Sequence, residues 1–362
     1  MSDIFRIHVF PAQRGDALWI EYGPAATPFR ILVDGGITKT GREYLIGLID
    51  GLGDPRIDLL VVTHIDLDHI QGVIALLKDL PPEVKINRVW FNGWDQLPRP
   101  PLQPHGVAEG IALSKQLEAR FKPAWNCNAG GSWIGVGPDG APRNIALPGA
   151  MVATVLSPDN DKLLALRDIW DDVVEEFGAA AEAEEEAEEE VQQPIDGLEP
   201  MGADEIDVAG LAEGRFQEDD AVPNGSSIAC LLTFKRKSAL LLADAHPSLV
   251  LASVKALSPG QPLRADCVKL SHHGSKYNTS LELAKQLESP RWIFSSNGAT
   301  TKHPNPEAVA RVLHGSPGKK ELLFNYRTKY NEMWDDATLM EDHDYTAVYG
   351  DGVKPMVVDL LP

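Results

Sequence analysis

The sequence VVTHIDLDHIQGV, residues 61–73, places two histidines and two aspartates within six positions. His64, Asp66, Asp68 and His69 directly follow an apolar run, where burying an unpaired charge is costly. Neutral imidazole and carboxylate oxygen are both zinc ligands, and the oxygen-containing mixture also suits manganese. A bound metal would compensate the carboxylate charge, so these four residues are predicted metal ligands.

The residues around this motif predict a strand, a ligand-bearing loop and a helix. IDLLVVT (57–63) is a continuous apolar run, typical of a strand buried on both faces. Apolar residues then recur at i, i+3, i+4 and i+7 between Ile70 and Leu77, which is helical spacing. A structural alternative, in which Asp68 caps this helix and the histidines are incidental, explains one of the four residues.

The remaining apolar patterns predict an α/β protein without an internal repeat. Strands are predicted at 5–10, 17–22, 30–36, 84–94, 149–158, 226–234, 238–246, before the histidine pair of 267–275, at 291–298, and once more within 346–361. Helices are predicted at 41–51, 107–121, 279–288 and 302–313.

Composition indicates a globular chain of 362 residues with 43% hydrophobic residues. The N-terminus lacks a basic region followed by an apolar segment, and no apolar run approaches the roughly 18 residues of a membrane span. The three cysteines, Cys127, Cys230 and Cys267, form no CxxC pair, which argues against a disulfide framework. We therefore expect a cytoplasmic protein without a membrane partner; the sequence gives no indication of its oligomeric state.

The formal net charge of −20 is concentrated in one segment. Between Asp161 and Asp220 there are 22 acidic and 3 basic residues, net −19, whereas the remainder carries 31 acidic and 30 basic residues, net −1. The run EEFGAAAEAEEEAEEEVQQP has the composition of a solvated or disordered insertion. We expect a solubilising linker, with a lid or a protein-docking site in 161–220 as the alternatives.

With these motifs the sequence resembles the metallo-β-lactamase superfamily, whose signature is HxHxDH. Asp66 stands where the signature has its second histidine, a substitution similar to the domain attached to bacterial DNA-uptake channels (ComEC-like) and its soluble relatives. The resemblance covers roughly residues 1–90, 149–160 and 224–350. The segments that carry it, in that family's order, are RGDALWIE (14–21), ILVDGG (31–36), THIDLDHIQG (63–72), VLSP (155–158), NGSSIACLL (224–232), LLADA (241–245), VKLSHHGS (268–275) and HPNPEAV (303–309).

The resemblance implies an αββα sandwich formed by one domain, residues 1–362, with 161–222 as an acidic insertion that is disordered or lid-like. It also implies two divalent metal ions, zinc or manganese, at one edge of the sandwich. The implied ligands are His64 and Asp66 for the first metal, Asp68, His69 and either His272 or His273 for the second, and Asp244 as the bridging carboxylate.

The implied ligand set departs from the superfamily pattern at one further position and leaves the choice between two histidines open. Another histidine usually lies between the first motif and Asp244, but this chain has NGSS (224–227), so the first metal is expected to be weakly held. If HHGS is extended, His272 and His273 point to opposite sides, so that one is a ligand and the other supports it or faces the substrate.

Asp68 and His303 are the predicted catalytic residues. His303, in the sequence KHP, could bind a phosphate oxygen or protonate a leaving group, with an ordinary loop role as the alternative. Asp34 is expected to hydrogen-bond the ligand loops, and Asp16 and His246 are expected to be structural. Three lysines flank the site and could neutralise a phosphodiester: Lys269, Lys276 and Lys302.

The favoured function is that of a metal-dependent phosphodiesterase or nuclease, because two metals clamp an in-line displacement at phosphorus and activate a water. Since the body of the chain is nearly neutral, a small phosphodiester, or nucleic acid delivered by a partner, fits better than tight DNA binding. The alternatives are hydrolysis of a lactone, thioester or amide, and a regulatory subunit with structural metals and a basic partner.

Overall fold

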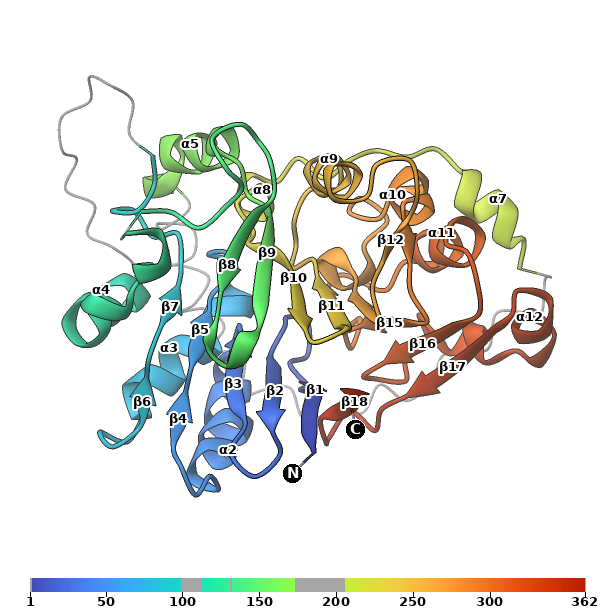
Figure 1. Ribbon diagram of the computed structural model, residues 1–362. Coiled ribbons are helices and arrows are strands. Elements are labelled where there is room, and N and C mark those ends of the chain that lie inside the picture. The colour runs from blue at the N-terminus through green and yellow to red at the C-terminus, as the bar shows by residue number, and fades with distance from the viewer. Residues whose placement is uncertain (1, 99–111, 131, 173–205, 362) are drawn as a thin grey trace.

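The apolar runs of the chain form two mixed sheets in the computed structural model (Figure 1). The structure describes residues 2–98, 112–130, 132–172 and 206–361. The first sheet has the order β18-β1-β2-β3-β5-β7, with β1 to β3 antiparallel and β3, β5 and β7 parallel. Its strands are β1 (Asp3–Val9), β2 (Leu18–Pro24), β3 (Phe29–Val33), β5 (Leu59–Val61), β7 (Val89–Trp90) and β18 (Met356–Leu361).

The second sheet has the order β17-β16-β15-β13-β11-β10-β9-β8, antiparallel from β8 to β11 and parallel from β11 to β17. Its strands are β8 (Arg143–Ala146), β9 (Val152–Ser157), β10 (Ala229–Phe234), β11 (Lys237–Leu241), β13 (Cys267–Lys269), β15 (Arg291–Phe294), β16 (Lys320–Phe324) and β17 (Tyr345–Tyr349). Two small ladders pair β4 (Arg56–Ile57) with β6 (Lys85–Ile86) and β12 (Leu263–Arg264) with β14 (Leu287–Glu288).

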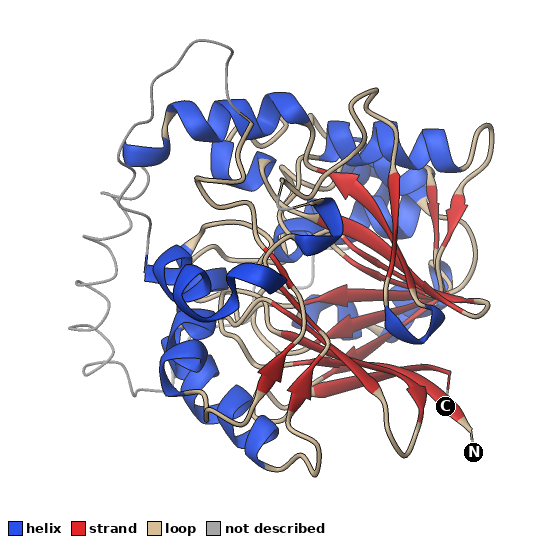
Figure 2. Cartoon of the chain, turned by 60° about the vertical axis from the view of Figure 1, so that its left-hand side comes forward, coloured by secondary structure: helices blue, strands red, loops and turns tan. Residues whose placement is uncertain are grey.

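Helices cover the outer face of each sheet, which gives four layers (Figure 2). The helices are α1 (Thr38–Thr40), a π-helical turn (Gly41–Leu45), α2 (Ile46–Asp50), α3 (Leu67–Asp79), α4 (Ala112–Phe121), α5 (Asn160–Asp168), α7 (Val208–Glu213), α8 (Val222–Gly225), α9 (Pro247–Leu257), α10 (Leu281–Lys285), α11 (Pro306–Gly315) and α12 (Ala337–Asp342).

Three apolar clusters explain this layering. The first joins α2, α3 and α4 to the outer face of the first sheet, and another joins α9, α10 and α11 to the outer face of the second. Between them, alternate residues of both sheets, such as Ile20, Ile31, Leu232 and Leu241, form a core that is buried from both sides. The arrangement is therefore the predicted αββα sandwich, and burying each apolar side chain contributes about 1.5–3 kcal/mol relative to its exposure.

Two predicted strands are divided in the structure. The single strand expected within 346–361 is wrong: β17 is an edge of the second sheet, whereas β18 pairs with β1 in the first. A turn separates them, because Gly352 has φ +67° and the Asp351 carboxylate accepts the backbone N–H groups of Val353 and Lys354. The stretch 84–94 likewise contains two short strands, β6 and β7.

The acidic segment joins β9 to β10, which are antiparallel neighbours in the second sheet. Its N-terminal end forms α5, and its C-terminal end forms α7 and leads into α8, so both described ends have regular structure. The central residues 173–205, where disorder or a lid was expected, lie outside the described residues, as does the first part of the helix predicted at 107–121.

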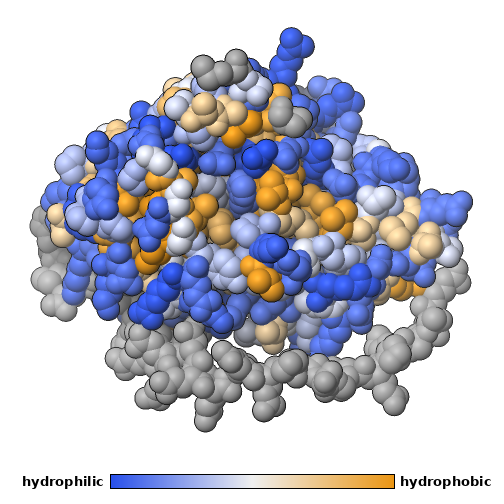
Figure 3. Space-filling model, turned by 90° about the horizontal axis from the view of Figure 1, so that it is seen from below, coloured by the Kyte–Doolittle hydropathy of each residue, from blue (hydrophilic) through white to orange (hydrophobic). Residues whose placement is uncertain are grey.

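On the face shown in Figure 3, hydrophilic residues predominate and apolar residues are interspersed among them. The large hydrophobic side chains that are more than about a third exposed are Phe216, Leu257, Tyr277, Val348, Val353 and Val357. Within the described ranges, no helix combines the length and apolar character that crossing a bilayer requires.

Candidate metal centre

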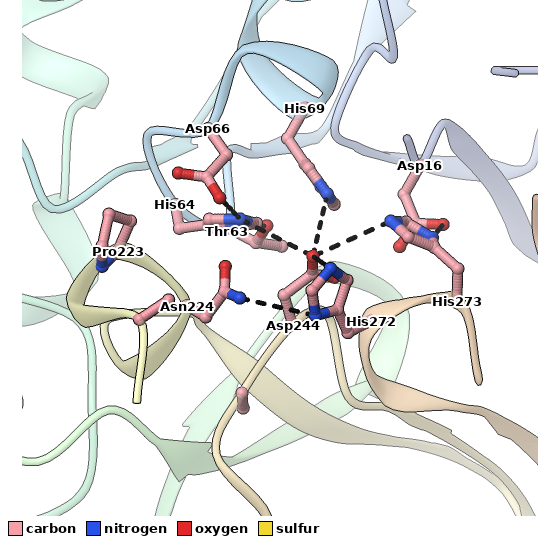
Figure 4. Close-up of polar contacts among 12 residues, drawn as sticks. Asp16, Thr63, His64, Asp66, His69, Pro223, Asn224, Asp244, His272 and His273 are labelled. Carbon is pink, nitrogen blue, oxygen red and sulfur yellow. Dashed lines mark hydrogen bonds and ion pairs between the residues drawn. The ribbon is translucent and has the colours of Figure 1, made fainter. Parts of the chain in front are cut away.

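The predicted ligands meet at one edge of the sandwich, where parallel strands of both sheets end. β3 leads into Asp34, β5 into His64, β11 into Asp244 and β13 into the histidine pair. Since the carboxyl ends of parallel strands lie at the same edge of a sheet, loops distant in sequence face one another there. Figure 4 shows the imidazoles directed at the Asp244 carboxylate from several sides.

One oxygen of Asp244 lies at the centre of four imidazoles. Its Oδ2 is 3.4 Å from Nε2 of His69, 3.7 Å from that of His273, and 3.9 Å from those of His64 and His272. Two ligand atoms held 2.0–2.2 Å from one tetrahedral metal lie about 3.4 Å apart. The spacing therefore suits ions between Asp244 and the histidines.

The other two predicted ligands lie at the periphery of this cluster. Asp66 has its Oδ2 3.5 Å from Nε2 of His64. Asp68, in the first turn of α3, forms with His69 and His273 a group whose potential ligand atoms lie within 4.8 Å of one another. The capping alternative for Asp68 is wrong, because Asp66 is the N-cap residue and makes no side-chain capping hydrogen bond.

Several buried ligand atoms have no hydrogen-bond partner. They are Nε2 of His64, His69 and His273 and Oδ1 of Asp66 and Asp244. A buried polar atom left unsatisfied costs about 1–3 kcal/mol, so five in one place would be strongly unfavourable without a ligand. Their chemistry, imidazole nitrogen and carboxylate oxygen, fits divalent zinc or manganese.

A single carboxylate fixes the tautomers of His64 and His69. Asp34 accepts hydrogen bonds from Thr63 N (2.8 Å), Thr63 Oγ1 (2.7 Å) and His69 Nδ1 (2.9 Å). Because the Thr63 hydroxyl donates to Asp34, its oxygen accepts from His64 Nδ1, 2.9 Å away. Both histidines consequently keep a proton on Nδ1, which leaves Nε2 as the nitrogen that a metal would bind, in agreement with the role expected for Asp34.

Asp16 and Lys269 support His273. Lys269, 1% exposed, donates a short hydrogen bond to Asp16 Oδ2, and Ser295 donates to Asp16 Oδ1. The same Oδ1 lies 3.4 Å from His273 Nδ1. Asp16 was expected to be structural and Lys269 to flank the site, but both lie directly behind an imidazole of the cluster.

His272 and His273 do not point to opposite sides, so that expectation is wrong. Both have left-handed backbone conformations, with φ of +46° and +56°, and the resulting turn directs both rings to Asp244. Asp34 and Ala243 also have positive φ. Such strained conformations are rare for residues other than glycine and cluster at functional sites.

Two residues near His272 were not among the predicted site residues. Its Nδ1 lies 3.0 Å from Asn278 Oδ1 and 3.8 Å from Asp219 Oδ2. Asn224, from the NGSS stretch, places its Nδ2 3.4 Å from the same nitrogen (Figure 4). Asp219 could not be distinguished from the other acidic residues of the acidic segment by composition, and Asn278 lies in no recognisable motif.

Mutual attraction between carboxylates and imidazoles shifts their pKa values. Burial alone would raise the pKa of Asp244, but His69, His273 and His272 hold it well below its usual range. Burial alone would lower the pKa of His272, but Asp244 and Asp219 raise it to about 9, and Asp244 and Asp34 likewise raise that of His69. A metal must therefore displace protons from these imidazoles.

His303 lies beside the histidine pair, its ring centroid 4.9 Å from that of His272. It is 6% exposed and its Nδ1 has no hydrogen-bond partner. Burial and the neighbouring His272 and His273 lower its pKa far below the usual value, so this imidazole is neutral. Of the flanking lysines, Lys276 pairs with Glu307 at 3.1 Å and Lys302 is exposed.

His246 has contacts that agree with the expected structural role. Its Nδ1 lies 2.9 Å from Lys162 Nζ, and its Nε2 donates to the carbonyl oxygen of Ala221 at 3.0 Å. It thus links the two described ends of the acidic segment, and both ring nitrogens are occupied.

The match to a protein family agrees with this architecture. Residues 29–143 match the metallo-β-lactamase superfamily, a region that includes the first ligand loop. Among curated proteins, no sequence matches this chain. The fold is similar to that of CmlA, a diiron β-hydroxylase from Streptomyces venezuelae, at 13% identity and a TM-score of 0.41, covering 100% of this chain and 54% of that one. A mutant of the CmlA β-hydroxylase gives 12% identity and a TM-score of 0.40, covering 99% and 54%. The chain thus spans about half the length of these solved structures.

Proposed function

We propose that this chain, which has the metallo-β-lactamase fold and a matching superfamily region, is a metal-dependent phosphodiesterase or nuclease of the ComEC-like type. The observation that carries the proposal is the convergence of four imidazole Nε2 atoms on Asp244 Oδ2, with unpartnered ligand atoms around it. Such a donor set suits two divalent ions, zinc or manganese.

The ligand groups suggest how two ions would be divided. His64, Asp66 and Asp244 would hold the first, and Asp68, His69 and His273 the second, with Asp244 shared. His272 lies next to Asn224, which belongs to the region where the superfamily usually has a further histidine. We therefore assign His272 to the first ion. When bound, the ions supply Lewis-acid stabilisation and an activated water for attack at phosphorus.

The protein's own groups would orient the substrate. The neutral His303 can donate a hydrogen bond to a phosphate oxygen, and its lowered pKa favours this role over proton donation. Lys302 precedes His303 in sequence and is exposed, so its positive charge is available to a phosphate bound there. With 31 acidic and 30 basic residues outside 161–220, the body supplies little attraction for a long polyanion, which favours a small phosphodiester or a delivered nucleic-acid end.

The test compares Asp68→Asn with Asp79→Asn. Both aspartates lie on α3, but Asp79 is exposed at its other end and pairs only loosely with Arg42. We expect wild type and Asp79→Asn to cleave a generic phosphodiester with Mn²⁺ or Zn²⁺, and Asp68→Asn to lose at least about 100-fold. Turnover of lactone, thioester or amide substrates alone would replace the proposal with a carbonyl hydrolase. Metal binding without any turnover would favour a regulatory, partner-binding role for the chain.

A further inference from the structure

We propose that Asp219, near the C-terminal end of the acidic segment, is a positioning residue that orients His272 through Asn278. The inference rests on the proposed metal centre and assigns a role to a carboxylate that composition places among solvated acidic residues.

The Asp219 carboxylate collects three hydrogen bonds beside the centre. Its Oδ2 accepts from Asn224 Nδ2 at 2.7 Å and from Asn278 Nδ2 at 2.8 Å, and its Oδ1 accepts from the backbone of Ala221 at 3.0 Å. The Asp219 side chain is 11% exposed, unlike a solvated acid. Both asparagine side chains therefore donate to the same carboxylate oxygen.

These bonds determine which way the Asn278 amide faces. Its Nδ2 donates to Asp219 Oδ2 and also, at 3.2 Å, to the carbonyl oxygen of Asp244. Both partners only accept, so the amide nitrogen must face them and the amide oxygen must face His272. Asn278 is fully buried, and its Oδ1 lies 3.0 Å from His272 Nδ1. His272 then keeps a proton on Nδ1, and its Nε2, directed at Asp244, is the nitrogen that would bind zinc once its own proton is displaced.

The stretch around Asp219 is held firmly against the body of the protein. The backbone N–H of Asp219 donates to the carbonyl oxygen of Tyr277. The neighbouring Glu218 carboxylate accepts a hydrogen bond from Ser248 N at the start of α9. Upstream, α7 packs against α11, and Arg311 donates to the carbonyl oxygen of Ala212. This end of the acidic segment therefore belongs to the framework of the metal centre, and its position and the orientation of His272 depend on each other.

The experiment measures the zinc affinity of the Asp219→Ala variant by competition with a chelator. The matched control is Asp220→Ala, because the neighbouring Asp220 is exposed. Outer partners of metal ligands typically contribute 10–100-fold in affinity, so Asp219→Ala should bind zinc about 10–100-fold more weakly and Asp220→Ala like wild type. Asp219→Asn, which keeps one acceptor oxygen, should recover part of the loss.

A second readout separates positioning from a general loss of structure. In the zinc-loaded protein, the hydrogen-bonded Nδ1 proton of His272, assigned with a His272→Gln variant, should give a ring N–H NMR signal that Asp219→Ala removes. Because Asp219 acts through Asn278, the double variant Asp219→Ala/Asn278→Ala should bind zinc no more weakly than Asn278→Ala alone. If Asp219→Ala folds poorly, Asn278→Ala alone tests the inference, because it must also weaken zinc binding and remove the His272 signal.

Wild-type affinity and an unchanged His272 signal in Asp219→Ala, or wild-type affinity in Asn278→Ala, would overturn this inference while leaving the metal centre intact. Failure of the wild type to bind any divalent ion would overturn both the inference and the proposed function.

Discussion

At the scale of single residues, the orientation of the predicted metal ligands depends on side chains that are not themselves predicted ligands. Asp34 accepts a hydrogen bond from His69 and, through Thr63, orients His64, which keeps a proton of each imidazole on the nitrogen that faces away from Asp244. The sequence allowed this role to be predicted, because Asp34 ends an apolar strand. Asp219 and Asn278 could not be predicted, since their role arises only when three distant loops meet.

Asp34→Asn should weaken zinc binding about 10–100-fold, because an amide cannot accept all three of the hydrogen bonds that orient His64 and His69. The control is Asp58→Asn, another buried aspartate, which accepts from Arg30 N at the opposite end of β5. Chelator competition should show wild-type zinc affinity for the control, although its thermal stability falls. Equal zinc affinities in the two variants would remove Asp34 from the ligand-orienting network.

Metal uptake should release protons near neutral pH. In the metal-free protein the pKa of His272 is raised to about 9 and that of His69 is also raised, so both imidazoles hold protons at pH 7 that a metal must displace. Apparent affinity should therefore increase as pH rises toward 9, and the number of released protons should decrease. Calorimetry in buffers of different ionisation enthalpy measures this number, and a value of zero at pH 7 would contradict the assignment of these ligands.

At the scale of elements, the first ligand loop is fixed by backbone contact between the end of β3 and α3. Gly35 N donates to the carbonyl oxygen of His69, and Gly72 N donates to that of Gly36. A methyl group on Gly72 would lie 1.9 Å from the Gly35 carbonyl oxygen, so only glycine allows this approach. The strand and the helix were predictable from apolar spacing, whereas their contact was not.

Gly72→Ala should lower the free energy of unfolding by about 1–3 kcal/mol, because the added methyl group has no space. Gly47→Ala, in α2, is the matched control: nothing lies within 4 Å of the added carbon, and alanine favours helix by about 0.5–1 kcal/mol. Urea denaturation should therefore shift the two midpoints in opposite directions. A neutral Gly72→Ala would show that the β3–α3 contact is looser than described.

At the scale of the whole molecule, the resemblance carried by the sequence motifs predicted the fold class, but not how the C-terminal strands pair. The two strands within 346–361 look continuous in apolar content, yet β18 crosses to pair with β1 because a glycine turn redirects it. Likewise β9 and β10 pair across the acidic segment, so we propose that 161–222 is an insertion within one domain. Hydrophobic pattern alone does not encode such long-range pairings.

Charge distribution makes a prediction for the molecule as a whole. Outside 161–220 the net charge is −1, so nucleic acid should be held by few phosphate contacts. The logarithm of the affinity for single-stranded DNA should fall with the logarithm of salt concentration with a slope no steeper than about −2, since each contact contributes about −0.7. Fluorescence anisotropy measures this slope; a slope steeper than about −5 would indicate an extended nucleic-acid surface and contradict the small-substrate interpretation.

The proposed function requires that Asp244 be shared between two divalent ions at the strand ends. Anomalous X-ray diffraction from crystals grown with Zn²⁺ or Mn²⁺ tests it most directly. We expect two peaks about 3.5–4 Å apart, one near His64 and Asp66 and the other near His69 and His273. No peak within ligand distance of Asp244, in a protein whose four histidines are intact, would contradict it.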